Sequence, residues 1–213
     1  MERRKAELAR RGERPVLEWT PVPMSRISPY LRRAAVAAED ARFYEHGGVD
    51  WEAVRASLEK DLEKKRLKAG GSTITQQLAK NLYLSPARTP WRKLREWAIA
   101  RRLERVLSKD RILELYLNVI EFGTRTYGAE AAARRYFATS AASLTPMQAA
   151  TLAAMIPSPR IYDPVRHAAR VQRRARRILR WMRVAEASPP TAAQASRASP
   201  TPPEPSPTPS AGD

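Results

Sequence analysis

Glu39 is the first residue in this sequence whose surroundings suit catalysis. It opens the stretch 39–48, which combines adjacent carboxylates, an aromatic pair, one of only two histidines and a Gly-Gly turn. A carboxylate at the end of a helix, beside a cleft, can act as a general base. The alternative is a surface ion pair with Arg42. The neighbouring Asp40 is more typical of a local cap, and His46 lacks the ligand spacing of a metal site, which favours a structural hydrogen bond.

A second candidate carboxylate is Glu96. On a helix, Arg92 and Lys93 lie four and three residues before it and share its face. An ordinary surface salt bridge is the alternative. Lys80 and Arg88 precede this group closely in the sequence. Cations that converge on a carboxylate-containing cleft suit a phosphate or pyrophosphate substrate.

The stretch 70–81 is unusually polar. It opens with Gly-Gly and then places hydrogen-bonding side chains and one lysine around three apolar residues. The hydrogen-bonding residues are Ser72, Thr73, Thr75, Gln76, Gln77 and Asn81. A helix with this polar density is costly to bury unless a polar ligand satisfies it. The stretch lacks the lysine of a Walker loop and follows no strand, so a nucleotide-binding P-loop is not indicated.

Apolar periodicity predicts the helices that position these groups. They are expected over residues 30–39, 49–68, 73–84, 91–107, 111–118, 129–137, 144–156 and 167–185. No stretch alternates with period two, which predicts an all-α fold. In the 49–68 segment, basic residues follow closely on the apolar stripe, so its polar face either meets solvent or contacts a membrane surface.

Composition narrows the classes of partner. The chain has 213 residues and a formal net charge of +17, which indicates an anionic partner: nucleic acid, acidic lipid or a phosphorylated substrate. There is no cysteine, hence no disulfide or thiolate metal site. We expect a charged lead-in over residues 1–18, one domain over 19–186, and a disordered tail over 187–213, which holds 8 of the 18 prolines from Ser188 onward.

The residues considered so far leave glycosyl transfer, glycan cleavage and nucleic-acid binding open. Over about Trp19 to Met182, however, the chain resembles the peptidoglycan glycosyltransferases of family 51. This family comprises monofunctional transglycosylases and the N-terminal domains of bifunctional (class A) penicillin-binding proteins. The matches occur in the order of the family motifs: Glu39-Asp40 to Phe43, His46 and Gly48; Gly71-Ser72-Thr73 to Gln76-Gln77-Leu78 and Lys80-Asn81; Arg92-Lys93 with Glu96; Lys109, Ile112-Leu113, Tyr116-Leu117-Asn118 and Gly123; and, more loosely, Arg173, Ile178-Leu179 and Met182.

The resemblance implies an all-α, lysozyme-like glycosyltransferase fold with a large lobe and a smaller membrane-proximal jaw. It implies that lipid II is polymerised into β-1,4-linked glycan strands, with inversion at MurNAc C1 and release of undecaprenyl pyrophosphate. Glu39 would be the general base, and Glu96 would assist at the pyrophosphate. In inverting hydrolases the two carboxylates are about 6.5–9.5 Å apart, because a nucleophile must fit between them.

The same resemblance assigns further residues to substrate binding. They are Asp40, Phe43, His46, Ser72, Thr73, Gln76, Gln77, Lys80, Asn81, Arg88, Arg92, Lys93 and Asn118. The resemblance does not fix a required cofactor; Glu96 would hold a divalent cation, Mg2+ or Mn2+, with the substrate pyrophosphate. The implied partners are lipid II, the growing glycan, the membrane surface and other cell-wall synthesis and division proteins, and not nucleic acid. The implied location is the periplasmic face of the bacterial cytoplasmic membrane, with no anchor present in this chain.

The sequence leaves three other functions open. A lytic enzyme of similar fold would cleave glycan and would not need a pyrophosphate pocket. A nucleic-acid-binding protein would account for the positive charge and the arginine-rich last helix, but not for the polar cluster in 72–81. An inactive relative could serve as a scaffold.

Overall fold

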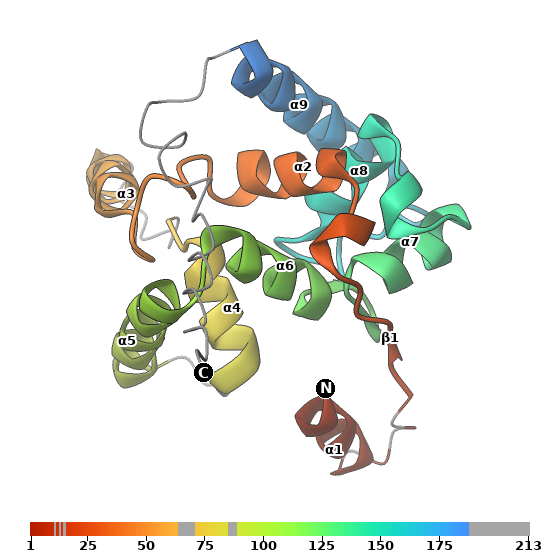
Figure 1. Ribbon diagram of the computed structural model, residues 1–213, viewed down its shortest axis with the longest axis horizontal. Helices are drawn as coiled ribbons and strands as arrows, with labels where there is room; N and C mark the ends of the chain where they lie inside the picture. Colours follow the sequence, from red (N-terminus) through yellow and green to blue (C-terminus); the bar gives the residue numbers. More distant parts are fainter. Residues whose placement is uncertain (11, 13, 15, 64–70, 85–88, 188–213) are drawn as a thin grey trace, which may run out of the picture.

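The computed structural model describes residues 1–10, 12, 14, 16–63, 71–84 and 89–187. Helices dominate it (Figure 1). They are α1 (Glu2–Arg10), α2 (Pro29–Glu39), α3 (Trp51–Glu63), α4 (Ile74–Tyr83), α5 (Pro90–Val106), α6 (Lys109–Val119), α7 (Ala129–Phe137), α8 (Pro146–Met155) and α9 (Ala168–Ala187), with short 3-10 turns at Met24–Arg26 and Ala141–Ser143. The prediction of a mostly helical fold is confirmed.

The predicted helices begin where local chemistry favours a helix start. Ser28, Thr73, Thr89, Ser108 and Thr145 each accept a hydrogen bond from a backbone N–H in the first turn of the helix that follows. The helices α2, α5 and α8 also carry proline in their first turn, where its missing N–H is not needed. These caps fix where α2 and α4 start, and so they help to place the functional groups that the two helices carry.

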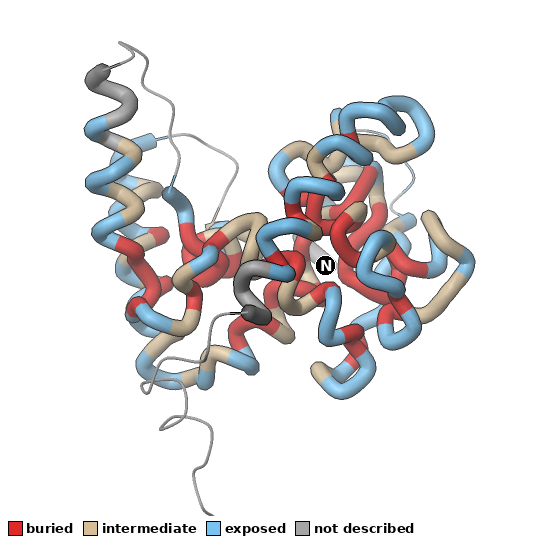
Figure 2. Tube along the Cα trace, turned by 90° about the horizontal axis from the view of Figure 1, so that it is seen from above, coloured by how far each residue is buried: buried red, intermediate tan, exposed pale blue. Residues whose placement is uncertain are grey.

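The core forms around α8, whose residues are buried on nearly every side. Helices α2 and α9 pack on α8, and α4 packs on α5 and α6. Figure 1 shows α2 and α6 at the centre, α7 and α8 to one side, and α3, α4 and α5 to the other. Buried segments occupy the middle of each group, with exposed segments around them (Figure 2). The group of α3, α4 and α5 corresponds to the predicted smaller jaw, and the group around α8 corresponds to the larger lobe.

A small sheet was not predicted. Its strands are β1 (Glu18–Trp19), β2 (Glu121–Gly123) and β3 (Thr126–Tyr127), in the order β1-β3-β2. Strand β3 pairs parallel with β1 and antiparallel with β2, with an irregular register at Glu121/Gly123. The glycines of this region had indicated a loop, and strands of two or three residues are too short to show an alternating pattern.

The N-terminal segment contacts the domain. Arg4 of α1 donates a hydrogen bond of 3.2 Å to Oδ1 of Asn81, and its guanidinium lies 5.0 Å from the ring centroid of Tyr127. Across the described ranges, no helix combines the length and the apolar character that crossing a bilayer requires. Arg88, the basic residues of 64–68 and the tail from 188 onward lie outside the described residues.

Candidate active site

Glu39 is the last residue of α2, and its carboxylate is largely buried. Nε2 of Gln77 donates a hydrogen bond of 2.9 Å to Oε2 of Glu39, whereas Oε1 is buried without a hydrogen-bond partner. Burial raises the pKa of Glu39 above its ordinary value. The hydrogen bond from Gln77 and the charges of Arg174 and Lys80 oppose this increase, and Asp40 adds to it. The alternative ion pair with Arg42 is not formed, because Arg42 pairs with Glu45, Asp50 and Glu52.

The orientation of Gln77 is set from the interior of the protein. The hydroxyl of Tyr116, on α6, donates a hydrogen bond of 3.1 Å to Oε1 of Gln77. Tyr116 is fully buried, and burial, with the nearby carboxylates of Glu39 and Asp40, raises the pKa of its phenol well above the ordinary value. The hydroxyl therefore stays protonated and remains a donor. Tyr116 had been predicted only as an inward-facing helix residue and a motif match.

Arg174 is a neighbour of Glu39 that the sequence did not single out. It lies on α9, and one of its terminal nitrogens is 3.6 Å from Oε1 of Glu39. Its side chain is mostly buried. The family resemblance had covered the last helix from Arg173 onward without naming Arg174. Only the packing of α9 on α2 shows which of the many arginines of α9 faces the carboxylate of Glu39.

Asp40 and His46 hold the turn after α2. The amide of Gly48 donates to Nδ1 of His46 at 3.2 Å, so Nε2 carries the proton and donates to Asp40 at 2.9 Å. Asp40 also accepts a hydrogen bond of 3.0 Å from the backbone N–H of Ile74, at the start of α4. Asp40, His46 and Asp50 place ligand-type atoms within 4.8 Å of one another, but this proximity is explained by their hydrogen bonds and by Arg42. The expected structural hydrogen bond of His46 is confirmed.

The polar residues at the start of α4 bind one another. Thr73 and Gln76 form a capping box, in which each side chain bonds the backbone N–H of the other. Thr73 Oγ1 also donates to the carbonyl of Gly48 at 2.7 Å. Gly48 has a positive φ of 94°, and a Cβ there would lie 3.2 Å from the backbone of Ala100. Much of the polar density of 72–81 is therefore satisfied internally, and it locks the turn at 46–48 against α4 and α5.

Phe43 lies in the core. It is fully buried and packs edge-on against Tyr44 and His46, with the ammonium of Lys109 4.5 Å from its ring centroid. Lys109 also donates to the carbonyl of His46 at 2.6 Å and to Glu104 at 2.9 Å. Phe43 thus supports the turn that carries the motif, and its position gives no support to the predicted contact with substrate.

Glu96 is only 3% exposed and pairs with two cations of its own helix. Arg92 donates to its Oε2 at 2.8 Å, and the ammonium of Lys93 binds its Oε1. Lys93 also donates to Oγ of Ser72 at 3.2 Å. The predicted sharing of one helix face is confirmed, and the low exposure of Glu96 distinguishes the group from an ordinary surface salt bridge.

Lys80 is close to both carboxylates. The residue as a whole keeps contact with solvent, yet partial burial lowers the pKa of its ammonium. Glu96 and, less strongly, Glu39 oppose this decrease, while Arg92 and Lys93 add to it. The charge of Lys80 therefore interacts with both carboxylates, and a fixed cation of this kind can stabilise an anionic leaving group.

Two predicted substrate-binding residues have other partners. Asn81 accepts from Arg4, as described above. Asn118 is buried, and its side chain binds the backbone N–H and C=O of Val22 at 2.8 and 2.9 Å and the carbonyl of Glu114 at 2.9 Å. Its own carbonyl accepts from Trp19 Nε1 at 2.8 Å. Asn118 therefore fixes the N-terminal segment in this structure, and its predicted contact with substrate gains no support.

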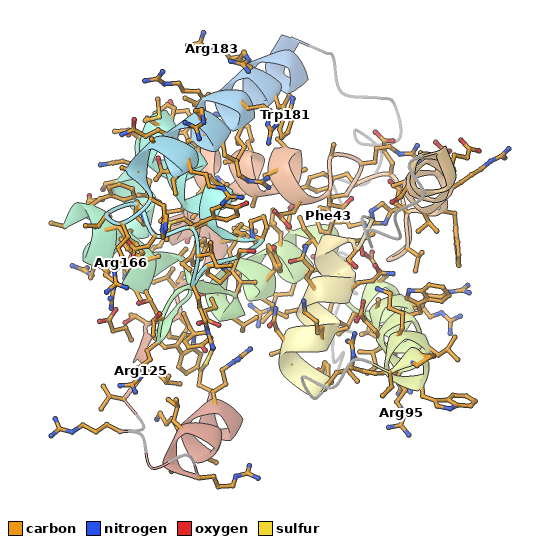
Figure 3. The ribbon with its side chains drawn as sticks, turned by 180° about the vertical axis from the view of Figure 1, so that it is seen from behind. Phe43, Arg95, Arg125, Arg166, Trp181 and Arg183 are labelled. Carbon is orange, nitrogen blue, oxygen red and sulfur yellow. The ribbon has the colours of Figure 1, made fainter. Side chains whose placement is uncertain are left out.

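A cavity of about 900 Å³ opens beside Glu39. Its described lining comes from the carboxyl half of α2, the turn after it, the start of α3, residues 71–73 and the end of α9. Arginines 32, 33 and 42 contribute positive charge to its wall. In Figure 3, the label of Trp181 marks the end of α9 above the region of Phe43, on the side of α9 that faces α2. The cavity gives a substrate access to the carboxylate.

The fold is mostly helical and presents a buried carboxylate to a cavity, which is the arrangement that the resemblance to lysozyme-like, glycan-processing enzymes implies. The family model described as "Transglycosylase" matches residues 7–183. A "Biosynthetic peptidoglycan transglycosylase" of Chromobacterium violaceum is 56% identical over 165 residues, which cover 78% of this chain and 72% of that protein. A protein of the same name from Nitrosospira multiformis is 52% identical over 84% of this chain and 78% of its own length. Another, from Dechloromonas aromatica, is 51% identical over 86% of this chain and 79% of its own length. This chain belongs to the transglycosylase family.

Proposed function

We propose that this protein is a peptidoglycan glycosyltransferase that polymerises lipid II into β-1,4-linked glycan strands. The observation that carries the proposal is Glu39: a carboxylate of raised pKa that faces a cavity and has a cationic cluster nearby. The names of the similar proteins and the family match support the same reaction.

Glu39 is the general base of the proposed reaction. Glu39 lines the cavity, which gives the 4-hydroxyl of the acceptor's N-acetylglucosamine a route to its carboxylate. A raised pKa brings the base closer to the pH of the reaction, which favours proton transfer in the transition state. The acceptor oxygen forms a bond to C1 of the donor's N-acetylmuramic acid as the bond from C1 to the pyrophosphate oxygen breaks. The electron pair leaves with the lipid pyrophosphate, and C1 is inverted.

The cationic group of Lys80, Arg92 and Lys93 stabilises the departing pyrophosphate. Charge grows on the leaving oxygens during the reaction, so fixed cations lower the barrier. Glu96 holds Arg92 and Lys93 in place through its two oxygens. Because both oxygens already bind cations, a divalent ion does not fit Glu96 without displacing one of them, and no step is assigned to a metal. Arg88, which the resemblance also places here, lies outside the described residues.

Because lipid II is anchored in a membrane by its lipid, the proposed reaction takes place at a membrane surface, which the family resemblance puts at the outer face of the cytoplasmic membrane. Exposed apolar side chains on the jaw suit contact with a bilayer: Trp51 of α3 is 60% exposed, and Trp91 and Leu94 of α5 are 76% and 51% exposed. Trp51 packs edge-on against Trp97, which joins α3 to α5. Aromatic residues are favoured at the interface between headgroups and water.

The test is polymerisation of labelled lipid II in detergent by the full chain, with Glu39→Gln and Lys80→Ala in parallel. We expect glycan from the wild type, a loss of at least about 100-fold for Glu39→Gln, and a smaller loss for Lys80→Ala. Circular dichroism checks that the variants fold. Full activity of Glu39→Gln would overturn the base assignment. Cleavage of preformed glycan by the wild type, without polymerisation, would favour the lytic alternative.

A further inference from the structure

Trp181 is a large apolar side chain that the core does not use. It lies near the end of α9 (Figure 3). It is 41% exposed and lines the same cavity as Glu39. The next residue, Met182, is buried and also lines the cavity. An indole exposed in a cavity beside a reactive group indicates a surface that binds a ligand.

Helix geometry relates Trp181 to the catalytic carboxylate. Arg174, whose guanidinium is 3.6 Å from Glu39, lies seven residues before Trp181. Seven residues make almost two helical turns, so both side chains leave α9 in nearly the same direction, about 10 Å apart along the axis. A different side of α9 packs into the core, and it is formed by Val171, Ala175, Ile178 and Met182. Trp181 therefore leaves α9 on the side that faces Glu39, and the two residues line one cavity.

The indole is also held in position. The guanidinium of Arg177, one turn earlier, lies 5.3 Å from the ring centroid of Trp181. Such a cation–π contact limits the motion of an exposed ring. A ring fixed before binding loses less entropy when a ligand packs on it.

We propose that Trp181 is a stacking platform for a sugar ring of the acceptor saccharide. The C–H groups on the flat face of a pyranose carry partial positive charge and pack on the electron-rich face of an aromatic ring. Glu39, the base that takes the acceptor's proton in the proposed reaction, lines the same cavity as Trp181, whereas Lys80, Arg92 and Lys93 are not among its described lining residues. A sugar ring beside Trp181 therefore belongs to the acceptor. The inference rests on the proposed function.

The lining offers both the apolar and the polar contacts that a sugar ring makes. Beside its apolar residues the cavity is lined by arginines 32, 33 and 42, by Asp50 and by the hydroxyl residues Ser72 and Thr73. These groups suit the hydroxyl and acetamido groups of a sugar and any anionic substituent on it.

Two measurements test the platform. The first is binding of a soluble probe, the β-1,4-linked tetramer of N-acetylglucosamine, to the full chain by saturation-transfer NMR and titration calorimetry. The second is the KM for a short-chain, water-soluble lipid II with the glycan donor held at saturation. The variants are Trp181→Ala and Trp181→Phe. The matched control is Tyr30→Ala, because Tyr30 is also an exposed aromatic residue under an arginine but is not among the residues lining the cavity.

We expect Trp181→Ala to weaken tetramer binding and to raise the KM about 3- to 10-fold, with kcat changed much less. Trp181→Phe should recover most of the loss, and Tyr30→Ala should match the wild type. The platform is overturned if the wild type does not bind the tetramer, or if Trp181→Ala binds it as well as the wild type. It is also overturned if the variant loses affinity only for a prenyl phosphate. Tetramer binding that depends on Trp181, in a protein that makes no glycan, would support the platform and contradict the proposed function.

Discussion

The hydroxyl of Tyr116 donates a hydrogen bond of 3.1 Å to Oε1 of Gln77, from a position without solvent contact. An amide can present either its oxygen or its NH2 group to a neighbour. With its oxygen held by Tyr116, Gln77 must turn Nε2 toward Glu39, where it donates at 2.9 Å. Tyr116 thus positions Gln77, and through it the general base, without touching the cavity.

Tyr116→Phe should therefore change the ionisation of Glu39. The variant leaves Gln77 free to rotate, which weakens a hydrogen bond that lowers the pKa of Glu39. We expect the acid limb of the kcat/KM profile to move to higher pH, by up to about one unit for a hydrogen bond of typical net strength. The control is Tyr136→Phe, which removes a hydroxyl that donates to the carbonyl of Phe122. An unmoved acid limb in a folded Tyr116→Phe protein would show that Tyr116 does not act through Gln77.

The raised pKa of Glu39 also means that this residue lowers the stability of the folded protein at high pH. The folded protein holds this proton at pH values where the unfolded chain, with a pKa near 4.5, has released it. The stability that Glu39 contributes is therefore present below pH 4.5 and lost as the pH rises through the folded pKa. We expect Glu39→Gln to melt at a higher temperature than the wild type at pH 8, and the difference to shrink toward pH 4. Calorimetry across this range measures it, and equal melting temperatures at pH 8 would contradict the direction of the pKa shift.

Much of this site could be read from the sequence because its signals are local. The spacing of Arg92, Lys93 and Glu96 fixes their contact on any helix, and Thr73 with Gln76 is a complete capping signal. The helices followed from apolar periodicity for the same reason. These features depend on residues three or four apart, which a sequence displays directly.

The contacts that could not be predicted join distant parts of the chain. Arg174 reaches Glu39 from another helix, and Tyr116 reaches Gln77 across 39 residues. The sequence also could not separate residues that line the site from residues that support it. Phe43, Asn118 and Glu39 all carry motif matches, but only packing shows that the first two are buried and fully engaged in the scaffold.

Asn118→Ala tests this separation. The substitution removes both hydrogen bonds to Val22 and one to Glu114, so we expect a loss of about 1–3 kcal/mol in the free energy of unfolding. Urea denaturation measures the loss, and hydrogen exchange should become faster at the amide of Val22. The kcat and the KM for lipid II should stay near the wild-type values. A raised KM with unchanged stability would instead support the predicted contact between Asn118 and substrate.

The cationic cluster allows a test of what Glu96 does. Arg92→Ala should destabilise the protein by about 2 kcal/mol, because it leaves a buried carboxylate with one cation in place of two. Glu96→Gln should instead slow polymerisation, because Arg92 and Lys93 lose the group that orients them, but by less than Glu39→Gln. In the double variant Arg92→Ala/Glu96→Gln the carboxylate that needed neutralising is absent, so part of the stability should return. Urea denaturation of the four proteins gives the coupling energy. If the changes in the free energy of unfolding caused by the two substitutions were strictly additive, Glu96 would not hold Arg92. Another residue would then have to orient the cations.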